Sequence, residues 1–86
     1  MANIWYGSIK TDGEYVTLAS ISSKTFTASK TYTIQVKGKC YLIEASSKPT
    51  SGGFLVTEGM PVQYTKGTGD LYVRNVSEFC TINIAE

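Results

Sequence analysis

The chain has no histidine among its 86 residues. Without an imidazole it cannot build the Ser-His-Asp or Cys-His arrangements that activate a nucleophile, and it lacks the commonest metal ligand of proteins. Catalysis by lysine or carboxylate remains open in principle, but most of the acids lie beside expected turns, where carboxylates are ordinarily solvated. We therefore expect no catalytic residue, no metal site and no cofactor, and a protein that is not an enzyme.

Charged residues are also scarce, at 17% of the chain against about a quarter in average domains. The formal net charge is +1, and the lysines and Arg74 are spread along the sequence. A protein that tracks phosphates needs a basic stripe, so nucleic acid is not an expected partner. A surface with few charges and many hydroxyls repels its neighbours weakly. It suits packing against other subunits, although a neutral monomer would have the same composition.

Long apolar runs are absent as well. No stretch approaches the roughly 20 apolar residues of a membrane helix, and the start MANIWYGSIK lacks the basic and apolar regions of a signal peptide. We expect no membrane partner and a chain that is made in the cytoplasm.

Only two cysteines occur, Cys40 and Cys80. They form neither a CxxC pair nor a zinc pattern. Two buried free thiols and one disulfide are both compatible with the sequence.

Helical periodicity is nearly missing, and strand-forming residues dominate in short runs cut by Gly, Pro, Ser and Asp. About eight short strands at this spacing predict an all-β fold in one domain, residues 1–86: an antiparallel β-sandwich or a small barrel, jelly-roll-like in its connections. The expected strands are 3–11, 14–21, 31–36, 40–45, 54–58, 62–65, 71–76 and 79–85.

Turn residues predict how these strands are joined. Asp12-Gly13 and Lys37-Gly38-Lys39 each predict a β-hairpin between the flanking strands. The last two strands are expected to form a third pair, joined near Ser77-Glu78. The polar segment around Phe26 reads either as a loop or as a short edge strand.

Alternation along the strands predicts which side chains face the core. The segment 40–45 is apolar on both faces, so it is expected to be a central strand that is covered twice. Tyr72 and Arg74 are expected to face outward. Tyr32, Ile34 and Val36 are expected to share one face of their strand. The expected inward residues of the last two strands are Leu71, Val73, Cys80, Ile82 and Ile84.

Glu44 is the one acid inside an otherwise apolar strand. It could be a buried acid with a raised pKa, the partner of a lysine across a subunit contact, or a solvated residue at a strand end. The glycine-rich run KGTGD at 66–70 lacks the spacing of a phosphate loop, so we interpret it as a hairpin loop.

Six tyrosines are compatible with a sugar-binding site or a protein interface, because tyrosine combines an apolar ring with a polar tip. The outward position of Tyr72 beside Arg74 favours the interface, and half-buried packing on a strand would account for it too.

The runs FTASKTYTIQVKG and GGFLVTEGMPVQYTKGTGDLYVRNVSEFCTINIAE resemble small β-structured bacteriophage virion proteins, namely head decoration (cement) proteins and β modules of tail fibres. The resemblance covers about the last two thirds of the chain. It implies a non-enzymatic virion protein, assembled in the host cytoplasm, that binds the major capsid protein or another virion protein. It also implies a homo-oligomer, for which a trimer is the expected form. The expected contact residues are Tyr72, Arg74, Pro49, Gly52, Gly53, Lys66 and Thr68.

Two other functions fit the same residues. One is a carbohydrate- or receptor-binding β module of a tail fibre, which needs exposed aromatic rings among polar side chains. The other is a small phage-encoded inhibitor that binds a host factor.

Overall fold

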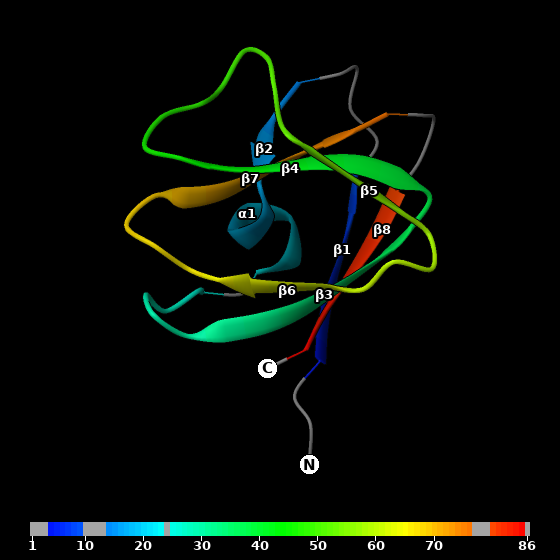
Figure 1. Cartoon of the computed structure of the whole chain (residues 1–86), viewed down its shortest axis with the longest axis horizontal. Helices are drawn as coiled ribbons and strands as arrows, with labels where there is room; N and C mark the ends of the chain where they lie inside the picture. Colours follow the sequence, from blue (N-terminus) through cyan, green and yellow to red (C-terminus); the bar gives the residue numbers. More distant parts are fainter. Residues whose placement is uncertain (1–3, 10–13, 24, 77–79, 86) are drawn as a thin grey trace.

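The computed structural model describes residues 4–9, 14–23, 25–76 and 80–85. These residues form short strands, and a single helical turn follows the second of them (Figure 1). The strands are β1 (Ile4–Ile9), β2 (Val16–Thr17), β3 (Thr31–Lys37), β4 (Lys39–Ala45), β5 (Phe54–Thr57), β6 (Val62–Thr65), β7 (Asp70–Asn75) and β8 (Cys80–Ala85), and the helix is α1 (Leu18–Ser22).

The strands form two four-stranded antiparallel sheets that face each other. Sheet A has the order β1-β8-β3-β6, and sheet B has the order β2-β7-β4-β5. The pairs β1–β8, β2–β7, β3–β6 and β4–β5 are those of a jelly roll, in which the chain is folded in half and then wrapped around the core. The all-β antiparallel sandwich expected from the sequence is confirmed, and the two sheets do not close into a barrel.

The three expected strand pairings between sequence neighbours are wrong. β1 pairs with β8 rather than β2, β3 and β4 lie in different sheets, and so do β7 and β8. Turn residues in the sequence predict that the chain reverses direction. They do not determine whether the next strand pairs with the preceding strand or joins the opposite sheet. Gly38, with φ of 106°, makes such a reversal between the sheets. Asp12-Gly13 and Ser77-Glu78 lie outside the described residues.

The expected strand at 14–21 is also wrong. Only Val16 and Thr17 are extended, and the next five residues form α1. A helical turn brings Leu18 and Ser22 to the same side, where both are buried, whereas an extended chain would separate them. The Ser22 hydroxyl donates to the Leu18 carbonyl at 2.7 Å. Of the two interpretations of the Phe26 segment, the loop is correct.

The core lies between the two sheets and follows the predicted alternation. All five residues expected to face inward are buried, and so are Tyr32, Ile34 and Val36, which were expected to share one face. Cys40, Leu42 and Val56 belong to the same hydrophobic cluster. β4 is an inner strand of sheet B, as expected. Its outer face is partly covered, because the loop 46–53 passes over it (Figure 1) and leaves Tyr41 half-buried.

Candidate functional site

Three large apolar side chains stand exposed on β5 and the turn that follows it. Phe54, Leu55 and Met60 are 64%, 45% and 51% exposed, and we call them the β5 ridge. β5 is the last strand of sheet B, so one side of its backbone has no strand beside it within the described residues. The turn that carries Met60 is closed by a hydrogen bond from the Met60 N–H to the Thr57 carbonyl, and Gly59 supplies the positive φ of 87° that it needs.

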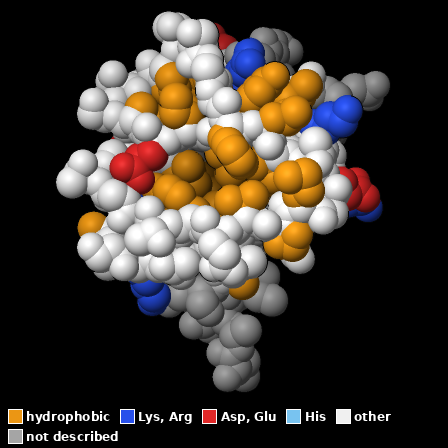
Figure 2. Space-filling model, viewed as in Figure 1, with side chains coloured by type: hydrophobic (Ala, Val, Ile, Leu, Met, Phe, Trp, Pro, Cys, Tyr) orange, Lys and Arg blue, Asp and Glu red, His pale blue; other side chains and the backbone are white. Residues whose placement is uncertain are grey.

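A shallow apolar hollow of about 180 Å³ adjoins the ridge. It lies where the β5 edge of sheet B faces the β6 edge of sheet A, and Figure 2 shows hydrophobic side chains gathered around a depression on this side of the molecule. Phe54 lines this hollow. Leu55 lies on the opposite face of β5, across from Tyr41, and Met60 lines a second hollow, on sheet A. The lining residues are Leu42, Ile43, Glu44, Phe54, Val62, Tyr64 and Leu71.

Glu44 ties the two sheets together at the rim of this hollow. Its carboxylate accepts hydrogen bonds from the Tyr64 hydroxyl of β6 at 2.6 Å and from the Gly67 N–H at 2.8 Å. The Gly69 N–H lies at 3.4 Å. These bonds, led by that of Tyr64, lower the pKa of Glu44, because they favour the charged form. Burial and the Glu44 carboxylate raise the pKa of Tyr64.

This arrangement corrects two interpretations of the sequence. Glu44 is exposed and its pKa is lowered, so the interpretation as a buried acid with a raised pKa is wrong. The loop 66–69 is not a hairpin loop, because it joins β6 of sheet A to β7 of sheet B. The N–H groups of Gly67 and Gly69 in this loop are directed at the Glu44 carboxylate.

Arg74 is held on the outer face of sheet B between two tyrosine rings. Its guanidinium carbon lies 5.3 Å from the ring centre of Tyr15 and 4.9 Å from that of Tyr41, within cation–π range. The Arg74 Nε is buried and has no hydrogen-bond partner. The Tyr15 hydroxyl donates to the Gly52 carbonyl, which pins the loop 46–53 over this face. A Cβ on Gly53 would lie 2.9 Å from the Tyr41 Cβ, so only glycine fits there.

The structure brings some of the expected contact residues together and separates others. Arg74 and the half-buried Tyr72 share the outer face of sheet B with Gly52 and Gly53, and Pro49 lies half-buried in the same loop.

Lys66 and Thr68 form a separate group in the loop 66–69. The Lys66 ammonium donates to the carbonyls of Gly67 and Gly69, so it is engaged within its own loop, while Thr68 is exposed.

Sequence reasoning missed the β5 ridge. The run FLVT was expected to be part of a strand, 54–58, without a prediction of which of its side chains are exposed. The usable signal was the length of the strand. A four-residue strand between Gly53 and the Gly59-Met60-Pro61 turn is typical of a sheet edge, where side chains are less covered.

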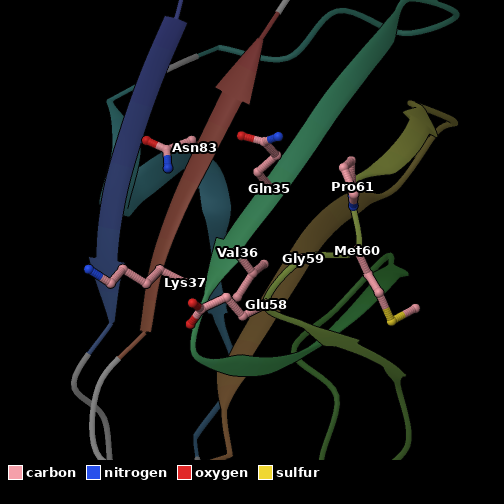
Figure 3. Close-up of a pocket in the computed structure, with 8 residues that line it drawn as sticks. All are labelled: Gln35, Val36, Lys37, Glu58, Gly59, Met60, Pro61 and Asn83. Atoms are coloured by element: carbon pink, nitrogen blue, oxygen red, sulfur yellow. The ribbon is translucent and has the colours of Figure 1, made fainter.

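A second hollow, of about 380 Å³, lies on the outer side of sheet A. Figure 3 shows Gln35 of β3 and Asn83 of β8 beside each other, with the Met60 side chain directed away from them. Glu58 accepts a hydrogen bond from the Gly38 N–H at 3.3 Å. The described lining residues include no aromatic ring, so the amides of this hollow and the tyrosines of sheet B do not form one site.

No cluster of three or more potential metal ligands is present among the described residues, and no described helix has the length and apolarity to cross a membrane. No family model, curated protein or solved structure matches this chain. The resemblance to phage virion proteins therefore stays a prediction.

Proposed function

We propose that this chain is a structural protein of a bacteriophage virion, a capsid decoration protein that binds a symmetric protein lattice through the β5 ridge. The observation that carries the proposal is the exposure of Phe54 at an apolar hollow, with Leu55 and Met60 also exposed on the same edge strand and the turn that follows it. Large apolar side chains that gather on one surface mark sites of protein contact, and an uncovered edge strand adds backbone groups that a partner strand can pair with.

The chemistry of this surface fits a protein partner. Glu44 already accepts hydrogen bonds at the rim of the hollow, so the partner surface that fits is mainly apolar. Each contact would be modest in area. On a symmetric lattice many copies, or one oligomer, engage together, and repeated weak contacts give strong attachment.

We further propose that the chain is a homo-oligomer, with a trimer as the expected form. An oligomer whose symmetry matches that of a lattice position places every ridge against an equivalent site. The outer face of sheet B, with Tyr72 and Arg74, offers a second surface for contacts between copies. Mass measurement of the native assembly tests this, and a monomer at all concentrations would contradict it.

Co-sedimentation with virus particles tests the main proposal. Phe54→Ser and Leu55→Ser together should lower retention on particles at least about tenfold, because central apolar anchors carry most of the energy of an interface. Val76→Ser is the matched control, since Val76 is also exposed, at 46%, but lies outside the ridge. Equal retention of the ridge variant and the wild-type chain would overturn the proposal.

A carbohydrate-binding module of a tail fibre is the second candidate. It is favoured by Tyr41 and Tyr72, which lie on the outer face of sheet B near Arg74. A glycan array decides between the candidates. Binding that is lost in Tyr72→Ala and kept in the ridge variant would support the carbohydrate module, and an array without hits would dispose of it.

A further inference from the structure

Cys40 and Cys80 face each other across the core. Cys40 lies on β4 of sheet B and Cys80 on β8 of sheet A, and both are fully buried. They share the one hydrophobic cluster between the sheets. Both are free thiols, and their side chains lie within hydrogen-bonding range of each other.

Each of the two thiols lies on an inner strand of a different sheet. In sheet B, Cys40 lies opposite Val56 of β5 and Asn75 of β7, so it occupies an inner strand. Cys80 is the first residue of β8, an inner strand of sheet A. The chain has no other cysteine. Any disulfide within one chain must therefore join these two residues, and it would join the two sheets.

The environment makes the two thiols unequal. The hydrogen bond with Cys80 and burial raise the pKa of Cys40. The same hydrogen bond, now received from Cys40, lowers the pKa of Cys80. The thiolate is the nucleophile in thiol–disulfide exchange, so one of the two cysteines must lose its proton before the exchange begins.

We propose that Cys40 and Cys80 are a modification site, at which a low-molecular-weight disulfide such as oxidised glutathione converts the two thiols into one disulfide between the sheets. This proposal is independent of the proposed virion function.

The reaction balances in two exchange steps. The thiolate of one cysteine attacks one sulfur of oxidised glutathione, which forms a mixed disulfide and releases one glutathione thiolate. The thiolate of the other cysteine then attacks the sulfur of the first and releases the second glutathione. The two protons lost by the cysteines are taken up by the two glutathione thiolates, so the chain is oxidised by two electrons and one glutathione disulfide is reduced to two thiols.

A disulfide between Cys40 and Cys80 would stabilise the folded chain, and its burial would limit the access of oxidants and reductants. It would close a loop from β4 to β8 and so restrict the unfolded chain. Because both sulfurs are fully buried, an oxidant or reductant reaches them only when the sandwich opens. The disulfide should therefore form readily during folding and resist reduction afterwards.

Refolding in two redox conditions tests this proposal. The wild-type chain is unfolded and refolded either in a glutathione buffer rich in the oxidised form or with excess dithiothreitol. We expect the oxidised sample to lose the mass of two hydrogen atoms, to show no alkylated thiol after denaturation, and to have a Tm higher by about 10 °C or more. Its reduction by dithiothreitol should be at least about tenfold slower in the folded state than in guanidinium.

Cys40→Ala and Cys80→Ala are the controls, and their Tm should not differ between the two buffers. The comparison within the wild-type chain does not depend on whether these variants fold. Two alkylated thiols in the oxidised sample, a stable glutathione adduct or a dimer joined by a disulfide would overturn the proposal. An internal disulfide that leaves the Tm unchanged or lowers it would overturn it too.

Discussion

The sandwich has two open sides, one between the edge strands β1 and β2 and the other between β5 and β6, and they differ in how well the core is covered. On the side of β1 and β2, α1 lies against β1, β2 and β7, with Leu18 fully buried and Ser22 buried beside it. On the side of β5 and β6, Phe54 remains exposed at the apolar hollow, and Leu55 is exposed on the other face of β5. Five residues are enough to cover one side, so the uncovered side is a feature of this sequence and not a necessity of the fold.

The difference in burial between Leu18 and the β5 ridge affects the free energy of folding. Full burial of a Leu or Phe side chain stabilises a protein by about 1.5–3 kcal/mol. The chain obtains this stabilisation from Leu18 and forgoes most of it at the β5 ridge. An apolar surface that does not contribute to folding remains available to contribute to association, and this is the physical basis of the proposed function.

Leu18→Ala should have the largest effect on the free energy of unfolding. Removal of a fully buried leucine should cost about 3 kcal/mol, from lost burial and from the cavity left behind. Chemical denaturation with a tryptophan or circular-dichroism signal measures it. A loss below about 1 kcal/mol would show that α1 does not close its side of the core, and the contrast between the two sides would fail.

Glu44→Gln should have an intermediate effect on the free energy of unfolding, because the Glu44 carboxylate links the two sheets through hydrogen bonds from Tyr64 and Gly67. We expect a loss of about 1 kcal/mol at neutral pH. Thermal unfolding at several pH values measures it. Glu58→Gln is the control, since Glu58 accepts one longer bond, of 3.3 Å, from Gly38.

The pH dependence of this variant follows from the lowered pKa of Glu44. A carboxylate whose pKa is lower in the folded chain stabilises the fold above its unfolded value, near 4.5, and this stabilisation is lost as the pH falls through the folded value. The wild-type chain should therefore lose more stability than Glu44→Gln between about pH 5 and pH 3. Parallel curves for the two proteins would contradict the role of Glu44.

Phe54→Ser should have the smallest effect on stability. The Phe54 side chain is mostly exposed, so its removal should change the free energy of unfolding by no more than about 0.5 kcal/mol. Denaturation under the conditions used for Leu18→Ala measures it. A loss as large as that of Leu18→Ala would mean that the ridge belongs to the core.

Much of the fold could be predicted from the sequence, because alternation reports burial directly. Val73 and Ile82 were expected inside on this basis, and both are fully buried. The pairing of strands could not be predicted. Gly38 permits a tight chain reversal both when the next strand pairs with the preceding one in the same sheet and when it joins the opposite sheet. α1 was missed because a five-residue helix is too short to show a helical period.

The candidate site was less predictable than the fold. Outward positions such as those of Tyr72 and Arg74 follow from alternation, and the structure places both on the outer face of sheet B. Exposure of Phe54 depends instead on which strand ends the sheet and on whether another element covers that side. Both depend on the arrangement of the whole chain, which local patterns do not encode.

Hydrogen–deuterium exchange of the chain, free and bound to virus particles, tests the central claim most directly. The account predicts that binding slows exchange of the backbone amides across residues 54–60 and leaves those of α1 unchanged, because β5 carries exposed apolar side chains whereas α1 packs its apolar residue Leu18 into the core. Unchanged exchange at 54–60 in the bound chain, or protection centred on α1, would contradict it.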